Sequence, residues 1–160
     1  MSVEPPRFLA DEMLGRLARY LRFVGCDTLY ARGWEDAAIA EAARTEGRTV
    51  LTRDRGLARR SPGALLLTTP EIGAQWRAVI AAFPAVPHRP EFLRCPLCNG
   101  RLVTFRRDPD SPRPPGVPWS RVDEGLPLFR CEGCAHLYWP GTHTDRIAET
   151  LRRWSPEAIP

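Results

Sequence analysis

The fold of this chain is decided by the stretch RFLADEMLGRLARYLRFVG, residues 7–25. It opens with a short apolar run that is typical of a buried strand and that ends at Asp11. After this acid, apolar residues recur every three or four positions, as on one face of a helix: Met13, Leu14, Leu17, Leu21 and Val24. Gly25 is a typical helix stop. The stretch therefore predicts a strand followed directly by an amphipathic helix.

The same alternation continues to residue 83. We expect further strands over residues 26–31, 48–52 and 64–68, and helices over 36–46 and 70–83, with about one helical turn within 55–63. Strands that alternate with helices predict right-handed crossovers and a parallel sheet sandwiched by helices. The first part of the chain is therefore of the α/β class.

Two Cys-x-x-Cys pairs stand in the second half, Cys95 with Cys98 and Cys131 with Cys134. Two such knuckles supply four sulfurs, the tetrahedral set that Zn²⁺ prefers in a structural site. The alternative is a pair of disulfides, which needs an oxidising compartment. The N-terminus does not look like a signal peptide, so we favour structural zinc and a cytoplasmic location.

A proline-rich linker at residues 84–90 separates the two halves. We predict an α/β domain over 1–88 and a small zinc-ribbon module over 89–160. Within the ribbon we expect strands near 101–107, 128–130 and 137–139, and a C-terminal helix over 144–154.

Three acids follow the predicted strands or open a helix at the same sheet edge: Asp11, Asp36 and Asp54. Their carboxylates should meet where ligands of open parallel sheets bind. Clustered hard oxygen ligands suit Mg²⁺ or Mn²⁺, which can activate water against a phosphodiester. Each acid also has a structural interpretation as a helix cap or turn residue.

The overall charge is mildly basic, at +4, and every basic residue is an arginine. This weakly favours a nucleic-acid partner and excludes any mechanism that needs a catalytic lysine. Arg16, Arg53 and Arg55 flank the acids and are the candidate phosphate contacts. No stretch approaches the roughly 20 apolar residues of a membrane span, so we expect no membrane association.

The residues 8–22 and 51–55, together with the two knuckles and 137–143, resemble the PIN-like ribonuclease domain with a C-terminal zinc ribbon. This domain is known from the C-terminus of the Mut-seven exoribonuclease (the Mut7-C RNase family), and the resemblance runs from about Arg7 to Arg153. It implies a parallel sheet between helices and metal-dependent RNA cleavage by Asp11, Asp36 and Asp54, and it leaves room for a protein partner at the ribbon.

The chain departs from the PIN pattern at one point. Many PIN domains carry a fourth acid soon after the third, whereas here Arg55-Gly56-Leu57 follows Asp54. Two hypotheses therefore stand: a metal-dependent ribonuclease, and a non-catalytic RNA- or ribosome-binding adaptor with the same fold and structural zinc.

Overall fold

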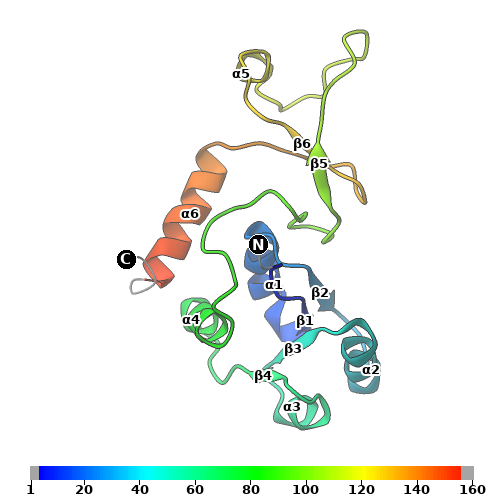
Figure 1. The fold of residues 1–160 in the computed structure, drawn as a ribbon, viewed down its shortest axis with the longest axis vertical. Helices are drawn as coiled ribbons and strands as arrows, with labels where there is room; N and C mark the ends of the chain where they lie inside the picture. Colours follow the sequence, from blue (N-terminus) through cyan, green and yellow to red (C-terminus); the bar gives the residue numbers. More distant parts are fainter. Residues whose placement is uncertain (1–3, 156–160) are drawn as a thin grey trace.

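The structure, a computed structural model, describes residues 4–155 and contains two sheets (Figure 1). The first sheet has four parallel strands in the order β2-β1-β3-β4: β1 (Phe8–Asp11), β2 (Thr28–Ala31), β3 (Thr49–Thr52) and β4 (Leu65–Leu66). The α/β class with a helix-covered parallel sheet is confirmed.

Four helices follow these strands: α1 (Gly15–Phe23), α2 (Asp36–Glu46), α3 (Arg55–Arg60) and α4 (Ile72–Ala82). The helix expected after Asp11 begins with a 3₁₀ turn, η1 (Glu12–Leu14), and the Asp11 side chain caps this turn by accepting the Met13 N–H. Gly47 ends α2 with φ of 62°, the left-handed conformation that favours glycine at this position.

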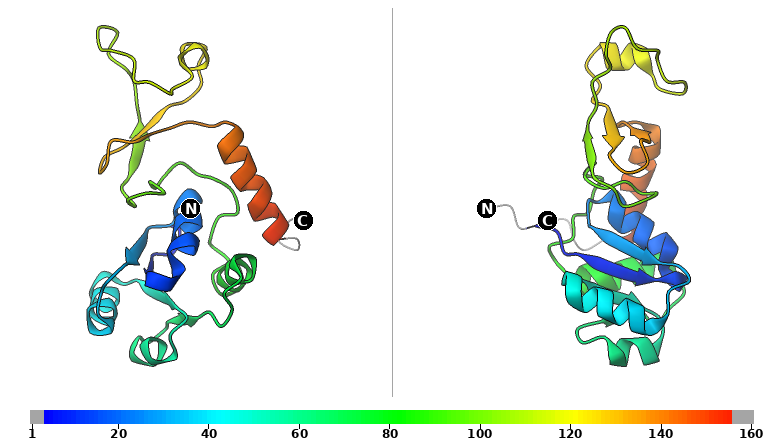
Figure 2. Two further views of the ribbon diagram at one scale, coloured as in Figure 1. Left: turned by 180° about the vertical axis from the view of Figure 1, so that it is seen from behind. Right: turned by 90° about the vertical axis from the view of Figure 1, so that its right-hand side faces the viewer.

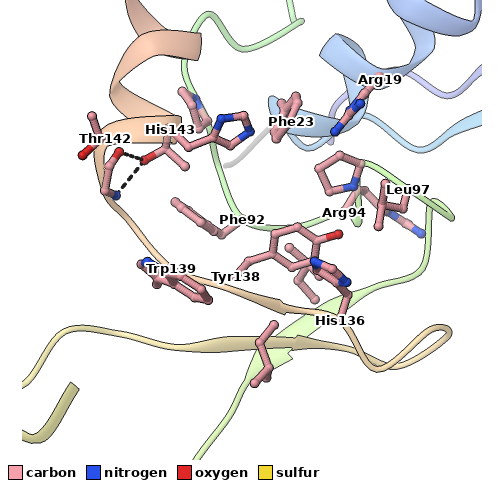
Figure 3. A pocket seen from close by; sticks show the side chains of 16 residues that line it. Arg19, Phe23, Phe92, Arg94, Leu97, His136, Tyr138, Trp139, Thr142 and His143 are labelled. Atoms are coloured by element: carbon pink, nitrogen blue, oxygen red, sulfur yellow. Dashed lines mark hydrogen bonds between the residues drawn. The ribbon is translucent and has the colours of Figure 1, made fainter. Parts of the chain in front are cut away.

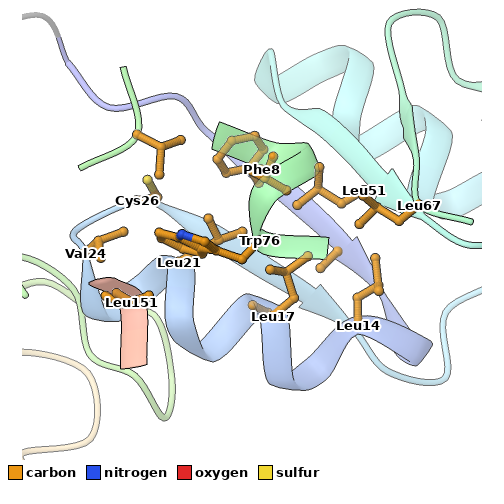
Figure 4. Packing of buried hydrophobic residues seen from close by; sticks show 14 of the residues in the cluster. Phe8, Leu14, Leu17, Leu21, Val24, Cys26, Leu51, Leu67, Trp76 and Leu151 are labelled. Atoms are coloured by element: carbon orange, nitrogen blue, oxygen red, sulfur yellow. The ribbon is translucent and has the colours of Figure 1, made fainter. Parts of the chain in front are cut away.

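The two faces of the first sheet are covered by different helices. On one face, Trp76 of α4 and Leu17 and Leu21 of α1 are fully buried against β1 (Figure 4). On the other face, Ile39 of α2 and Leu57 of α3 pack in a second cluster. Each fully buried aliphatic side chain of this kind stabilises the fold by about 1.5–3 kcal/mol.

The second sheet is small and antiparallel, with the order β5-β6-β7: β5 (Leu102–Thr104), β6 (Phe129–Cys131) and β7 (Leu137–Tyr138). A short helix, α5 (Trp119–Asp123), lies in the β5–β6 connection, where the sequence predicted no regular element. The chain closes with α6 (Thr142–Trp154), which begins two residues earlier than expected.

Helix α6 runs from the ribbon back to α4 (Figures 1 and 2). Its Ile147 and Leu151 belong to the same buried cluster as Trp76, whose indole N–H donates to Ser155 Oγ at 2.7 Å. The core of the first half is thus completed by the last helix of the chain. The predicted division into domains over 1–88 and 89–160 stays a prediction. Both predicted domains include terminal residues that lie outside the described range.

Polar contacts fix the first knuckle against the first sheet. The buried Arg22 of α1 donates to the backbone carbonyls of Thr28, Pro96 and Leu97. The Asn99 side chain accepts the Thr28 N–H at 2.9 Å and donates to Asp27 at 2.7 Å. The ribbon therefore docks on α1 and the start of β2 through defined polar contacts.

Among the described residues, none of the helices has the length and apolarity that crossing a bilayer requires.

Candidate functional site

The first candidate site lies at the carboxyl edge of the parallel sheet, between β1 and β3. These strands are neighbours, and the chain leaves β1 to one side and β3 to the other. Ligands of open α/β sheets bind in the crevice at such a switch point. Asp11 is the last residue of β1, and Asp54 stands two residues beyond β3. The topology therefore brings these two acids to the edge that the sequence predicted.

Asp11 is held tightly at this edge. Its side chain is largely buried, with 5% of the residue exposed. One carboxylate oxygen accepts the Met13 N–H at 3.0 Å, and the other accepts the Thr52 hydroxyl and the Arg53 N–H. Hydrogen-bond donors thus surround a carboxylate that belongs to a buried strand end, an arrangement that fixes its rotamer.

Thr52 connects Asp11 to Asp54. Its fully buried hydroxyl donates to Asp11 and accepts the Asp54 N–H at 2.9 Å. Asp54 in turn caps α3, because its Oδ1 accepts the Leu57 N–H at 2.8 Å. Within residues 4–155 its Oδ2 makes no hydrogen bond. One oxygen of Asp54 is therefore available to a ligand at the sheet edge.

Asp36 is the first residue of α2 and is held by a partner that sequence reasoning missed. Arg60, in the last turn of α3, forms an ion pair with its carboxylate. A Cβ placed on Gly56 would lie 3.0 Å from Asp54 Oδ1 and 3.6 Å from the same guanidinium. Arg60 therefore reaches across the start of α3, beside both acids. Nothing in the sequence around Arg60 distinguishes it from the other exposed arginines.

The three acids do not form a complete metal-coordination shell. Within residues 4–155, the only group of three or more metal-ligating side chains whose ligand atoms all lie within 4.8 Å is the set of four cysteines. Asp11 and Asp54 meet through Thr52, whereas Asp36 meets this edge through Arg60. The donor set consists of hard oxygens, which fit Mg²⁺ or Mn²⁺ by their chemistry.

The three arginines that the sequence singled out differ in exposure. Arg16 is exposed on α1, and Arg55 is exposed at the start of α3. Arg53 is half-buried, and its Nε atom is buried without a hydrogen-bond partner in the described residues. Its contact with Asp11 is made by the backbone N–H, and the buried Nε atom is not exposed to an anionic ligand in this conformation.

Glu12 ties the loop that carries Asp36 to the turn after Asp11. Its carboxylate accepts the Gly33 N–H at 3.3 Å, and its carbonyl accepts the Tyr30 hydroxyl at 2.8 Å. Trp34, the next residue of this loop, is exposed.

The second candidate site is the cysteine cluster. The Sγ atoms of Cys95 and Cys134 are 3.7 Å apart, and those of Cys98 and Cys131 are 3.4 Å apart. A tetrahedral site with Zn–S bonds of about 2.3 Å places its sulfurs about 3.8 Å apart. A disulfide requires about 2.05 Å, so all five cysteines are free. The four thiols thus form a group that could hold a metal ion, and its geometry fits zinc.

The backbone around the cysteines supports the metal site. The N–H groups of Gly100, Gly133 and Cys134 point at Sγ atoms, at 3.3–3.4 Å. A Cβ on Gly100 would lie 2.7 Å from the Cys131 sulfur, so only glycine fits there. Backbone donors aimed at sulfur stabilise the thiolate form that binds metal.

The thiols compete for negative charge. Loss of hydration around the sulfur, together with hydrogen bonds to the neighbouring cysteines, raises the pKa of Cys98 to about 12. Burial also opposes ionisation of Cys95, but hydrogen bonds from the Tyr138 hydroxyl and the backbone lower its pKa to about 7. A divalent cation relieves this competition, because it lets all four sulfurs ionise together. Cys26, outside the cluster, is fully buried and burial raises its pKa to about 12, so it is no nucleophile.

Comparison with known proteins rests on one match. No curated protein and no solved structure matches the chain. The family model described as the Mut7-C RNAse domain matches residues 6–151. This span contains all four clustered cysteines. It also contains Asp11, Asp36 and Asp54 at the carboxyl edge of the parallel sheet, which we call the acid edge. The expected family is confirmed: this chain belongs to the Mut7-C RNAse domain family.

Proposed function

We propose that this chain is a metal-dependent ribonuclease whose PIN-like acid edge hydrolyses RNA phosphodiester bonds. The observation that supports this most strongly is the bridge from Asp11 through Thr52 to Asp54 at the switch point of the sheet. One buried hydroxyl there contacts the carboxylate of Asp11 and the backbone N–H of Asp54, two acids from distant parts of the sequence. The family relationship points to RNA as the substrate.

Each residue of the edge has a defined task in this proposal. Asp11, Asp54 and Asp36 would hold Mg²⁺ or Mn²⁺, which when bound lowers the pKa of water and neutralises phosphate charge. Thr52 fixes the Asp11 oxygen and the Asp54 backbone. Arg53 and Arg55 follow β3 and would bind the phosphate, with Arg16 farther along the RNA. If Asp36 binds a metal ion, its ion pair with Arg60 must break. If Asp36 does not bind the metal, the Arg60 guanidinium stays as the positive charge next to Asp36.

The four cysteines would hold a structural zinc ion in this proposal. The site is closed by four protein ligands and so leaves no position for substrate. Its task is to fix the ribbon over residues 89–160 on the domain over 1–88, through the contacts of Arg22 and Asn99. A protein partner of the ribbon is part of the same proposal.

The test measures cleavage of a labelled single-stranded RNA with and without Mn²⁺. We expect Mn²⁺-dependent cleavage that falls by more than about a hundredfold in the double variant Asp11→Asn, Asp54→Asn, since even outer-shell changes cost 10–100-fold. The matched control is Asp108→Asn with Asp110→Asn, two exposed acids in the β5–β6 connection. Cleavage that persists in the first double variant contradicts the assignment.

The adaptor hypothesis keeps one specific observation in its favour. Arg60 already neutralises Asp36, and no acid follows Asp54 to replace it. An adaptor predicts RNA binding that is sensitive to salt and indifferent to the aspartate changes, with no cleavage in Mn²⁺.

A further inference from the structure

A cavity of about 530 Å³ lies where the two halves of the chain meet (Figure 3). Its walls come from the end of α1, the segment before the first knuckle, β7 and the start of α6. This volume is typical of sites for small organic ligands. The acid edge adjoins the other end of α1, about 14 Å away along a nine-residue helix. The cavity is therefore distinct from the proposed cleavage site.

Several aromatic side chains line the cavity, together with proline and leucine residues. The aromatic side chains include Phe23 from α1, Phe92 from the segment before the first knuckle, Tyr138 and Trp139 from the β7 region, and His143 from α6. Phe23 and His143 already form an edge-to-face pair with ring centroids 5.9 Å apart. Planar rings that surround an open volume suit a flat aromatic ligand, because stacking is favourable for every nucleobase.

The charge of the cavity is positive. Arg19 and Arg94 line it, and no aspartate or glutamate side chain does. Arg94 pairs with Asp27, whereas Arg19 has no ion pair within residues 4–155 and lies over the Phe23 ring. The first turn of α6 also opens on the cavity, and its backbone N–H groups favour an anion. Aromatic walls beside guanidinium groups match a ligand that is both flat and anionic.

Helix α1 connects the cavity to the acid edge. Arg16, Arg19 and Phe23 are spaced three and four residues apart, so they form one stripe along the helix. Both arginines are exposed. The stripe begins beside the turn after Asp11 and ends at the cavity wall, which gives an RNA backbone a line of positive charge to follow.

We propose that this cavity binds a base of single-stranded RNA, with Trp139 as a stacking platform and Arg19 on the adjoining phosphate. The role of the cavity as a substrate site rests on the ribonuclease function proposed above. It adds that the substrate is single-stranded RNA, because only an unpaired base can enter such a cavity. The RNA strand then passes along α1 from the cavity to the acid edge.

The test compares two labelled 12-mers in zinc-loaded protein without Mn²⁺ or Mg²⁺: oligouridine, and an abasic strand with the same phosphates. We expect oligouridine to bind at least about tenfold more tightly, a ratio in the range of one stacked base. Trp139→Ala should bring the ratio close to one, and Trp139→Phe, which keeps an aromatic face, should preserve most of it. An unchanged ratio in Trp139→Ala, or equal binding of both strands by the native protein, overturns the proposal and favours a protein ligand for this cavity.

Charge is tested separately. Arg19→Ala should weaken both strands alike and reduce the salt dependence of binding, whereas Arg44→Ala, which removes an exposed arginine on α2, should change neither. Zinc content and thermal melting verify each variant. If Trp139→Ala loses zinc, the exposed His143→Ala replaces it, with the same expected loss of base preference.

The two proposals fail in different ways. If the cavity proposal alone is wrong, the native protein cleaves RNA with Mn²⁺ while Trp139→Ala binds both 12-mers as the native protein does. If the ribonuclease proposal alone is wrong, the preference for oligouridine depends on Trp139 but Mn²⁺ produces no cleavage.

Discussion

The cysteine cluster and the acid edge are both groups of four or fewer side chains, yet they are assembled in different ways. Each cysteine pair is brought together by its own short turn, and two antiparallel strands place the turns face to face. The acids come from three separate elements, and the order of the parallel strands brings Asp11 and Asp54 to one edge. Short-range spacing thus determines the first site, and sheet topology determines the second.

The two sites also differ in what balances their charge. The thiols lie within 4.8 Å of one another, and the donors that contact them are neutral: backbone N–H groups and the Tyr138 hydroxyl. The acids have internal partners: Thr52 on Asp11, and Arg60 on Asp36. A fold that needs a cation at the cysteines can therefore exist without one at the acids. This difference predicts that metal removal affects stability at one site and chemistry at the other.

The largest expected effect is loss of the ribbon fold when the cysteine site is broken. Cys98→Ser with Cys131→Ser should abolish zinc binding and unfold the second sheet, since structural zinc contributes about 10–16 kcal/mol in small zinc modules. Zinc content and hydrogen exchange of β6 measure this. Cys26→Ala, in the core, should retain one zinc and lose only about 1 kcal/mol. A double variant that keeps its β6 protection contradicts the structural role.

The acid edge should respond in chemistry first. Thr52→Val keeps the side-chain shape but removes the hydroxyl that joins Asp11 to Asp54. We expect Mn²⁺ affinity to fall about 10–100-fold and the free energy of unfolding to fall by about 1–3 kcal/mol. Metal titration and urea unfolding separate the two effects. Thr45→Val, at an exposed position on α2, is the control. Unchanged Mn²⁺ affinity would leave Thr52 a purely structural residue.

The next largest effect is expected from the contacts that dock the ribbon on the first sheet. Asn99→Gly removes the acceptor for the Thr28 N–H and the donor to Asp27, and glycine tolerates the φ of 66° found there. We expect a loss of about 1–3 kcal/mol in unfolding free energy, because a buried N–H is left unpaired. Zinc should remain bound, since Asn99 is not a ligand. Loss of zinc would show instead that the knuckle depends on this contact.

The sequence predicted more of the fold than of the acid edge. All four parallel strands and the helices between them followed from apolar periodicity, because each element buries one face locally. The 3₁₀ turn after Asp11 escaped this reasoning, since apolar periodicity does not distinguish a 3₁₀ turn from the first turn of an α-helix. Helix α6 was predicted as an element, but its docking against Trp76 was not, because periodicity does not identify the partner of an apolar face.

The candidate site shows the same limit. Spacing alone gave the four cysteines, and strand order brought Asp11 and Asp54 to one edge as expected. Arg60 could not be found in this way, because its pairing with Asp36 depends on how α3 packs beside α2. Charged residues on neighbouring helices carry no sequence signal of their partners. The assignment of Asp11, Asp36 and Asp54 as metal ligands therefore stays a prediction.

Acid stability should report on the contact between the halves. Burial opposes ionisation of Asp27, but hydrogen bonds from Arg48 and Asn99 and the charges of Arg48 and Arg94 lower its pKa to about 2. Since this lies below the unfolded value of about 3.9, the stabilisation is complete above pH 4 and is lost as pH falls through 2. Asp27→Asn should cost about 1 kcal/mol at pH 7 after solvent screening and flatten the stability curve between pH 4 and 2. Urea unfolding across this range measures it, and an equally steep curve in the variant would assign the acid sensitivity elsewhere.

The smallest change in stability is expected for Arg60→Ala, and this variant tests directly whether Asp36 belongs to a cation site. Arg60→Ala removes an ion pair whose side chains are 58% and 44% exposed, so the free energy of unfolding should change by less than about 1 kcal/mol. If Asp36 belongs to a cation site, the same change removes a competing positive charge and should raise Mn²⁺ affinity several-fold, which calorimetry at low ionic strength can measure. Arg59→Ala, its exposed neighbour without an ion pair in the described residues, should leave Mn²⁺ affinity close to the native value. Weaker Mn²⁺ binding in Arg60→Ala would mean that the guanidinium holds Asp36 in place for the metal, and unchanged binding would place Asp36 outside the site.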